Sequence, residues 1–294
     1  MSRESLVDID ALWDFQHPDA SERAFHNLLP AALSSGNATY HAELLTQIAR
    51  AQGLQGHFDQ AHTTLALAAQ LLANAAPGAH IRYFLERGRV FHSSGDNSQA
   101  RPAFVDAWEL ARKHGEAAYA IDAAHMLGIV EPLEDQLLWT ERALGLAEET
   151  TDERARRWLG PLYNNLGWTY HDTGRYEEAL DMFRRDVRFR HETGQIREAR
   201  LARWAVGRTL RALEQYEEAL RVQEALRNEL ECCGHEDGYV YEELGEILFA
   251  TDQPDEARAY FRHAHALLSQ DDWLAGHEPE RLTRLRTLAE TQPT

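Results

Sequence analysis

Histidine, cysteine and carboxylate side chains are the groups of this sequence that could bind a metal ion or transfer protons. The 294 residues include 15 histidines and 48 acidic residues. The segment 231–237, which contains Cys232, Cys233 and His235, is the stretch richest in metal-ligand types. It lacks the spaced cysteine pairs of zinc sites, and it falls where a helix should end. We therefore interpret it as a solvated connection with a buried thiol.

The other candidates for catalysis lack the spacing that catalysis needs. His263 and His265 are two residues apart, which places them on different faces of a helix. The sequence contains no nucleophile elbow, phosphate-binding loop, dinucleotide fingerprint or zinc-protease motif. Acidic pairs recur at equivalent places, 177–178 and 217–218, which favours a solvated surface over a single active site. The sequence thus predicts no enzyme, no catalytic residue, no metal site and no cofactor.

Composition excludes two classes of partner. Acidic residues outnumber Lys and Arg by 48 to 30, so the formal net charge is −18 and a nucleic acid would be repelled. No stretch approaches the roughly 20 apolar residues that span a bilayer, and the first residues form no apolar leader.

Cys232 and Cys233 are adjacent and cannot form an ordinary disulfide, which predicts a reduced, cytoplasmic protein. Lys113 is the only lysine, so almost all the positive charge is arginine.

Internal repeats organise the elements that must position these side chains. Five times, a small residue is followed twelve positions later by alanine. The best-preserved copy has apolar residues at helical spacing, then Gly174, then a second run at the same spacing. Gly167 would let two antiparallel helices approach closely, with Ala179 as the small residue on the facing helix. Each copy is therefore predicted to be a helical hairpin. The pairs are Ala49 and Ala61, Gly88 and Ala100, Gly167 and Ala179, Gly207 and Ala219, and Gly245 and Ala257.

The best-preserved copy resembles the tetratricopeptide repeat, whose signature places an aromatic residue, Leu-Gly, Tyr, Ala and Phe at these offsets. In the copy around Gly207, Gln223 stands where an aromatic residue is expected. A sixth, degenerate copy contains Leu127-Gly128, and Pro132 interrupts it. The residues that carry the resemblance are Tyr163, Leu166, Gly167, Tyr170, Gly174, Tyr176, Ala179 and Phe183.

The resemblance implies an all-α fold, an α-solenoid of about six helical hairpins that form a right-handed superhelix. The repeats cover residues 42–272, with starts near 42, 81, 121, 160, 200 and 238. Their period of about 40 residues resembles kinesin-light-chain-like and bacterial peptide-sensor repeats. Residues 1–41 are predicted to be N-terminal capping helices, and residues 273–294 a C-terminal capping helix and tail. Left-handed caps at the ends of second helices are expected at Gly78, Gly115, Gly194 and Gly234.

The first helix of each pair lines a concave groove in this family, so the resemblance also implies which residues face a ligand. Arginine can bind carboxylates through two hydrogen bonds, and tryptophan offers apolar area at low entropic cost. The groove is expected to select acidic and hydrophobic residues, while the glutamates occupy the outer helices. The predicted groove residues are Arg50, Leu85, Arg89, His92, His125, Asn164, Trp168, His171, Trp204, Arg208 and Arg211.

Alternatives stay open for these side chains. The arginines could pair with carboxylates on adjacent helices, and the two tryptophans could pack between repeats. Asn164-Asn165 resembles part of the carboxylate clamp of chaperone-binding repeats, but the lysines that complete such a clamp are absent. Recognition of a chaperone tail is therefore not expected.

The sequence predicts a non-enzymatic, cytoplasmic scaffold or adaptor that binds a peptide or a partner protein in its groove. Nucleic acid and membrane are not expected partners, and a homo-oligomer is open. The alternatives are a peptide-responsive signalling regulator, a self-associating structural protein, and an enzyme that uses groove histidines and carboxylates as acid and base.

Overall fold

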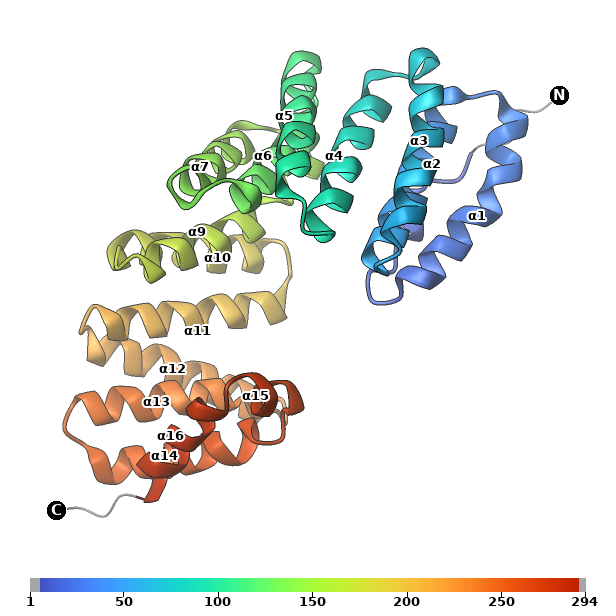
Figure 1. Cartoon of the computed structure of the whole chain (residues 1–294). Coiled ribbons are helices and arrows are strands. Elements are labelled where there is room, and N and C mark those ends of the chain that lie inside the picture. The colour runs from blue at the N-terminus through green and yellow to red at the C-terminus, as the bar shows by residue number, and fades with distance from the viewer. Residues whose placement is uncertain (1–5, 291–294) are drawn as a thin grey trace. The chain divides into compact units, whose positions relative to one another are not determined.

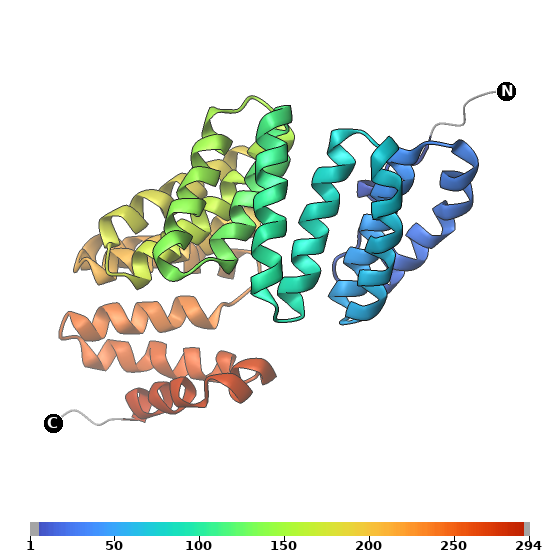
Figure 2. The same cartoon turned by 45° about the horizontal axis from the view of Figure 1, so that its top comes forward.

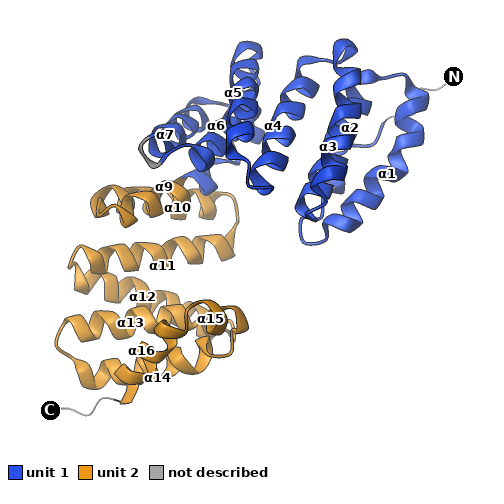
Figure 3. Ribbon diagram, viewed as in Figure 1, with its two compact units in different colours: residues 1–162 blue, residues 163–294 orange. Residues whose placement is uncertain are grey.

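The computed structural model describes residues 6–290, and this part of the chain is all-α, with no strand (Figure 1). The predicted helical hairpins are present, and the two helices of a hairpin run antiparallel, as a second view also shows (Figure 2). Contacts divide the chain into two compact units, residues 1–162 and 163–294 (Figure 3). The boundary lies inside helix α9, Leu159–Asp172, at a place that no linker marks in the sequence.

Unit 1 contains three helical hairpins, α2/α3, α4/α5 and α6/α7, preceded by one long helix. The first helix of the first hairpin begins at residue 38, four residues before the predicted start of the repeats. The bounds are η1 Asp10–Leu12, α1 Pro18–Ser35, α2 Ala38–Leu54, α3 Phe58–Leu71, η2 Leu72–Asn74, α4 Pro77–Ser93, α5 Asn97–His114, α6 Ala117–Val130, α7 Leu133–Glu149 and α8 Glu153–Arg156.

Unit 2 contains the hairpins α11/α12 and α13/α14, and most of α9/α10. Helix α16 packs on α14 and closes the hydrophobic core at this end with Leu285 and Ala289. The bounds are α10 Tyr176–Glu192, α11 Ile196–Ala212, α12 Tyr216–Cys232, α13 Gly238–Ala250, α14 Pro254–Leu268, α15 Asp272–His277 and α16 Pro279–Glu290.

A contact between a glycine and an aromatic ring recurs inside the hairpins. A β-carbon added to Gly167 would lie 2.4 Å from the ring of Phe183, so only glycine fits there. The residue that requires the glycine is therefore the phenylalanine. In α11/α12 the side chain of Gln223 takes the place of the ring, against Gly207. The three glycine–ring pairs are Gly88 with Phe104, Gly167 with Phe183, and Gly245 with Phe261.

Three of the four predicted glycine caps have a left-handed backbone. Gly115, Gly194 and Gly234 have φ angles of 71°, 72° and 73° and lie within two residues of the ends of second helices. The prediction for Gly78 is wrong, because Pro77 begins helix α4 and Gly78 lies in its first turn. Pro132 also stands at the start of a helix, because α6 ends at Val130 and Pro132 is the N-cap of α7.

Candidate functional site

One face of the first helices carries the predicted residues. We call this surface the inner face of unit 1 where it belongs to α2, α4 and α6, and the inner face of unit 2 where it belongs to α9, α11 and α13. The prediction of Leu85 as a groove residue is wrong, because its side chain is 1% exposed in the core of unit 1 and offers no surface to a ligand. The other ten predicted residues are all partly exposed.

The arginines on the inner face of unit 1 are paired with carboxylates of neighbouring first helices. Glu86, which is 3% exposed, accepts hydrogen bonds from Arg50 at 3.1 Å and from Arg89 at 2.8 Å. Arg89 also donates to Asp122 on α6. Burial lowers the pKa of Arg89, but Asp122 and Glu86 raise it by more, so the guanidinium is held in its charged form. The open alternative of intramolecular pairing is the arrangement that the structure has.

The two predicted histidines of unit 1 contact neighbouring side chains. His92 Nδ1 lies 2.8 Å from Asn97 Oδ1. The ring centroid of His125 lies 5.2 Å from that of Trp158. Burial lowers the pKa of His125, and the negative charge of Asp122 raises it by a smaller amount. His92 lines a cavity of about 160 Å³ together with Arg50, Leu54, Arg89 and Met126.

Aromatic side chains connect the first helices of unit 2. The ring centroids of Trp168 and Trp204 are 5.9 Å apart, and those of Trp204 and Tyr239 are 6.0 Å apart. Trp204 Nε1 donates to the backbone oxygen of Tyr239 at 3.1 Å. Trp168 also packs edge-on against Phe183, at 5.0 Å. The tryptophans thus pack between repeats and also present a partly exposed edge on the inner face of unit 2.

Arginine–glutamate pairs continue beside these rings. Glu243, which is 1% exposed, accepts from Arg208 at 3.0 Å and from Arg211 at 2.8 and 3.1 Å. The Arg208 guanidinium carbon lies 5.5 Å from the centroid of the Trp204 ring. A cavity of about 380 Å³ here is lined by equal numbers of arginines and glutamates, so the inner face of unit 2 is not a surface of unpaired positive charge. Its lining is Arg208, Arg211, Arg281, Arg284, Glu242, Glu243, Glu246 and Glu278.

His171 and Arg208 each keep one buried nitrogen without a partner. Within the described residues, His171 Nε2 and Arg208 Nε make no hydrogen bond. The His171 ring lies 5.4 Å from the Trp168 ring, and its side chain is 14% exposed. Burial, and then the charge of Arg208, lower the pKa of His171. Asn164 donates to the neighbouring Asn165 at 3.3 Å.

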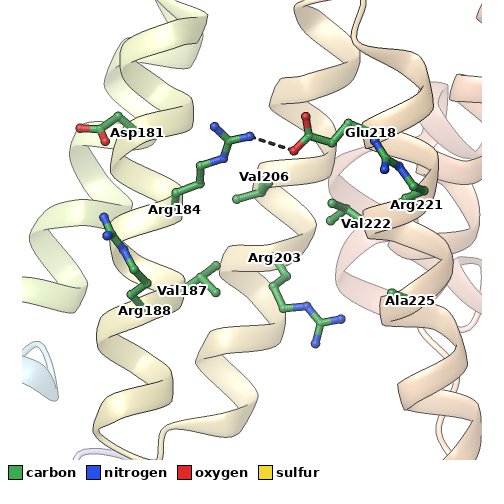
Figure 4. A pocket seen from close by; sticks show the side chains of 10 residues that line it. All are labelled: Asp181, Arg184, Val187, Arg188, Arg203, Val206, Glu218, Arg221, Val222 and Ala225. Carbon is green, nitrogen blue, oxygen red and sulfur yellow. Dashed lines mark hydrogen bonds and ion pairs between the residues drawn. The ribbon is translucent and has the colours of Figure 1, made fainter.

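A cavity of about 780 Å³ lies among α10, α11 and α12 (Figure 4). Val187, Val206 and Val222 give it apolar walls, and an ion pair of 2.9 Å between Arg184 and Glu218 joins α10 to α12 across it. Arg184 and Arg188 of α10 and Arg221 of α12 line this outer recess together with Arg203 of α11, so second helices carry arginine as well. The lining residues are Asp181, Arg184, Val187, Arg188, Arg203, Val206, Glu218, Arg221, Val222 and Ala225.

Among the side chains that the structure describes, those of residues 6–132 and 135–290, no three or more His, Cys, Asp or Glu are arranged to hold a metal ion. None of the described helices has the length and apolar character needed to cross a membrane. Cys232 and Cys233 are both exposed, so the expected buried thiol is wrong. Arg200 donates to Cys233 Sγ at 3.5 Å.

Comparisons with known proteins give the fold. The family model described as "Tetratricopeptide repeat" matches residues 162–193, which hold nearly all of the hairpin α9/α10. No curated protein matches the sequence. The chain is similar to the structure of apo RapI, with 12% identity and a TM-score of 0.76 over 97% of this chain and 79% of RapI.

Two further solved structures show the same likeness. The quorum sensor NprR from B. thuringiensis matches with 12% identity and a TM-score of 0.60, over 97% of this chain and 81% of NprR. A signal transduction ATPase with a tetratricopeptide repeat sensor, from Pyrococcus horikoshii, matches with 14% identity and a TM-score of 0.72 over 91% of this chain. The chain spans only 41% of the length of that ATPase. At such identities the likeness establishes the fold.

Proposed function

Because the chain is a tetratricopeptide repeat protein, we propose that it binds a peptide, or an extended segment of a partner protein, on the inner face of unit 2. The observation that carries this proposal is the pair of unpartnered nitrogens, His171 Nε2 and Arg208 Nε, beside the partly exposed rings of Trp168 and Trp204. A buried polar atom without a partner costs about 1–3 kcal/mol. A ligand carbonyl or carboxylate placed here would remove that cost.

The ligand that suits this surface has an acceptor group next to an apolar side chain. Arg208 Nε is an obligate donor, and neutral His171 donates from Nε2 in one of its two tautomers. The tryptophan rings offer apolar area of the kind that dominates binding energy in interfaces. Since Arg208 and Arg211 already share Glu243, the proposed recognition depends on one or two directed hydrogen bonds rather than on a positively charged surface.

The proposed role is a non-enzymatic adaptor or scaffold in the cytoplasm that needs no cofactor. Its two exposed cysteines fit a reducing compartment, where thiols stay free. A peptide-responsive regulator is the second candidate. It is supported by the fold that the chain shares with the quorum sensor NprR over 97% of its length.

Peptide selection from a random display library on the wild-type protein tests the proposal. Selected peptides should bind Trp204→Ala at least about tenfold more weakly, a loss of about 1.4 kcal/mol, in fluorescence anisotropy. Arg184→Gln, in the outer recess, is the control and should bind as the wild type does. If the selected peptides bind Trp204→Ala and the wild type equally well, the inner face of unit 2 is not the binding site.

The same peptides separate the two candidate roles. A regulator should change its X-ray scattering profile when a saturating peptide is added, because its ligand must favour one conformation over another. An adaptor only has to hold its partner, so its profile should change by no more than the added mass.

A further inference from the structure

Residues 6–16 lie against α2 and α4 and contact Arg50 on the inner face of unit 1. Tyr40 donates its hydroxyl to the backbone oxygen of Val7 at 3.0 Å, and Trp13 Nε1 donates to Gln47 Oε1 on α2 at 2.9 Å. Ile9 is buried among core residues of α1, α2 and α3. The segment therefore contacts α2 by its backbone and its side chains.

Asp10 is the anionic centre of this segment. One carboxylate oxygen accepts from Arg82 on α4, and the other accepts from Arg154 on α8 at 3.3 Å. These partners are 72 and 144 residues away in the sequence. The Arg82 side chain is 10% exposed, and its other carboxylate, Glu43 on α2, is 3.9 Å away. A buried guanidinium with only one distant carboxylate is strongly unfavourable, so Arg82 selects an anion at this position.

Two aromatic rings follow the carboxylate. Trp13 and Phe15 stack in parallel with centroids 4.7 Å apart. The Arg50 guanidinium lies over both rings, 5.6 Å from Trp13 and 5.3 Å from Phe15. Arg50, a predicted ligand contact, is thus covered by this chain's own aromatic residues.

We propose that the inner face of unit 1 is a second peptide-binding site, selective for a carboxylate followed three residues later by an aromatic side chain. Residues 6–16 occupy this site as an internal ligand, and a partner segment with the same acidic and aromatic pattern competes for it. Arg82 and Arg154 bind the carboxylate, and Arg50 with Gln47 binds the aromatic part.

Competition by an attached segment lowers the apparent affinity for an external one. A binding-competent state that is only a small fraction of the population reduces the apparent affinity by that fraction. Releasing the internal segment should therefore strengthen the binding of an external peptide. If residues 6–16 only cover the end of the core, their release should leave no peptide-binding site behind. The site shares no residue with the inner face of unit 2, so it can fail or hold independently of the function proposed above.

The test uses the full chain and a fluorescein-labelled synthetic peptide that repeats residues 6–16. In the variant Asp10→Arg, the attached segment carries a cation toward Arg82 and Arg154 and should leave the site. The labelled peptide should then bind at least about tenfold more tightly than to the wild type in fluorescence anisotropy. Hydrogen exchange should show that residues 6–16 lose protection while the helices keep theirs.

Asp8→Asn is the matched control, because Asp8 lies on the same segment and accepts a hydrogen bond from the Asp10 backbone, without a described arginine partner. Its affinity for the peptide should stay within about twofold of wild type. Should Asp10→Arg fail to fold, Asp10→Asn removes the charge with a smaller disturbance and must show the same direction. A released segment without tighter peptide binding overturns the proposal, as does equal binding by wild type and variant. A Trp204→Ala variant should bind this peptide as wild type does, which separates the two sites.

Discussion

The glycine at position 167 is determined by one ring on the facing helix. A β-carbon there would lie 2.4 Å from Phe183 Cε1 and within 2.8 Å of two further ring atoms. We expect Gly167→Ala to lower the free energy of unfolding by about 1–3 kcal/mol, because the added methyl group forces the helices apart or the ring off its rotamer. Urea denaturation followed by circular dichroism measures this change.

Gly145 supplies the control, since it also lies inside a helix, α7, and an added β-carbon meets nothing within 4 Å. Gly145→Ala should raise the free energy of unfolding by about 0.5–1 kcal/mol, the usual gain in helix propensity. Equal effects of the two substitutions would show that the ring contact does not require glycine.

Glu214 has a backbone conformation that suits glycine. Its φ is 60°, in the turn between α11 and α12, where the corresponding turn of α9/α10 has Gly174 with φ 77°. An L-residue other than glycine pays about 1–2 kcal/mol in this region. Glu214→Gly should therefore stabilise the protein by roughly 1 kcal/mol, seen as a higher denaturation midpoint at unchanged slope. Gly174→Ala should have the opposite sign, and a loss of stability in both variants would contradict the argument.

Among the secondary-structure elements, neighbouring first helices are joined by ion pairs. Glu243 on α13 is buried and serves two arginines of α11, so its removal leaves two guanidinium groups without their carboxylate. We expect Glu243→Gln to cost about 3–5 kcal/mol of unfolding free energy. The exposed pair between Arg184 and Glu218 is the comparison, and Glu218→Gln should change stability by less than about 1 kcal/mol. Denaturation of both variants in guanidinium chloride shows whether burial of the carboxylate determines how much stability is lost.

The helical hairpins could be predicted from the sequence because their cause is local. A glycine facing a ring sixteen residues later recurs in three hairpins, and the turn glycines stand at fixed places between them. The inner-face arginines were also predicted by position, since helical spacing fixes which residues share a face. Their partners were not, because Glu86 and Glu243 lie 36 and 35 residues away from Arg50 and Arg208, on the next first helix.

Two surfaces depend on contacts that no repeat pattern encodes. The docking of residues 6–16, a segment that precedes the predicted repeats, requires Asp10 to meet Arg154, 144 residues later. The outer recess depends on small and branched side chains of three successive helices, α10, α11 and α12. In both cases the residues are ordinary in type and become informative only when the fold brings them together.

On the scale of the whole molecule, partly buried histidines make the stability of both units depend on pH. Burial is the main cause that lowers the pKa of His41 and His125 in unit 1 and of His171 in unit 2. In the unfolded chain these side chains titrate near pH 6.5. Above that pH they are neutral in both states and protonation costs nothing. As the pH falls from about 6.5 through the lower folded pKa values, the unfolded chain binds more protons, so stability is lost.

The loss of stability at lower pH gives a prediction in which the effect of these three histidines can be separated from that of the other titrating groups. The free energy of unfolding of the triple variant His41→Gln, His125→Gln, His171→Gln should change less between pH 7.5 and pH 5.5 than that of wild type, because the excess proton uptake of the unfolded chain is removed. Most carboxylates stay ionised over this range, so the difference between the two proteins isolates the histidines. His114→Gln, at the exposed end of α5, should keep the wild-type dependence. Urea denaturation at the two pH values measures all three proteins, and parallel curves for wild type and triple variant would mean that burial of these rings does not control the acid response.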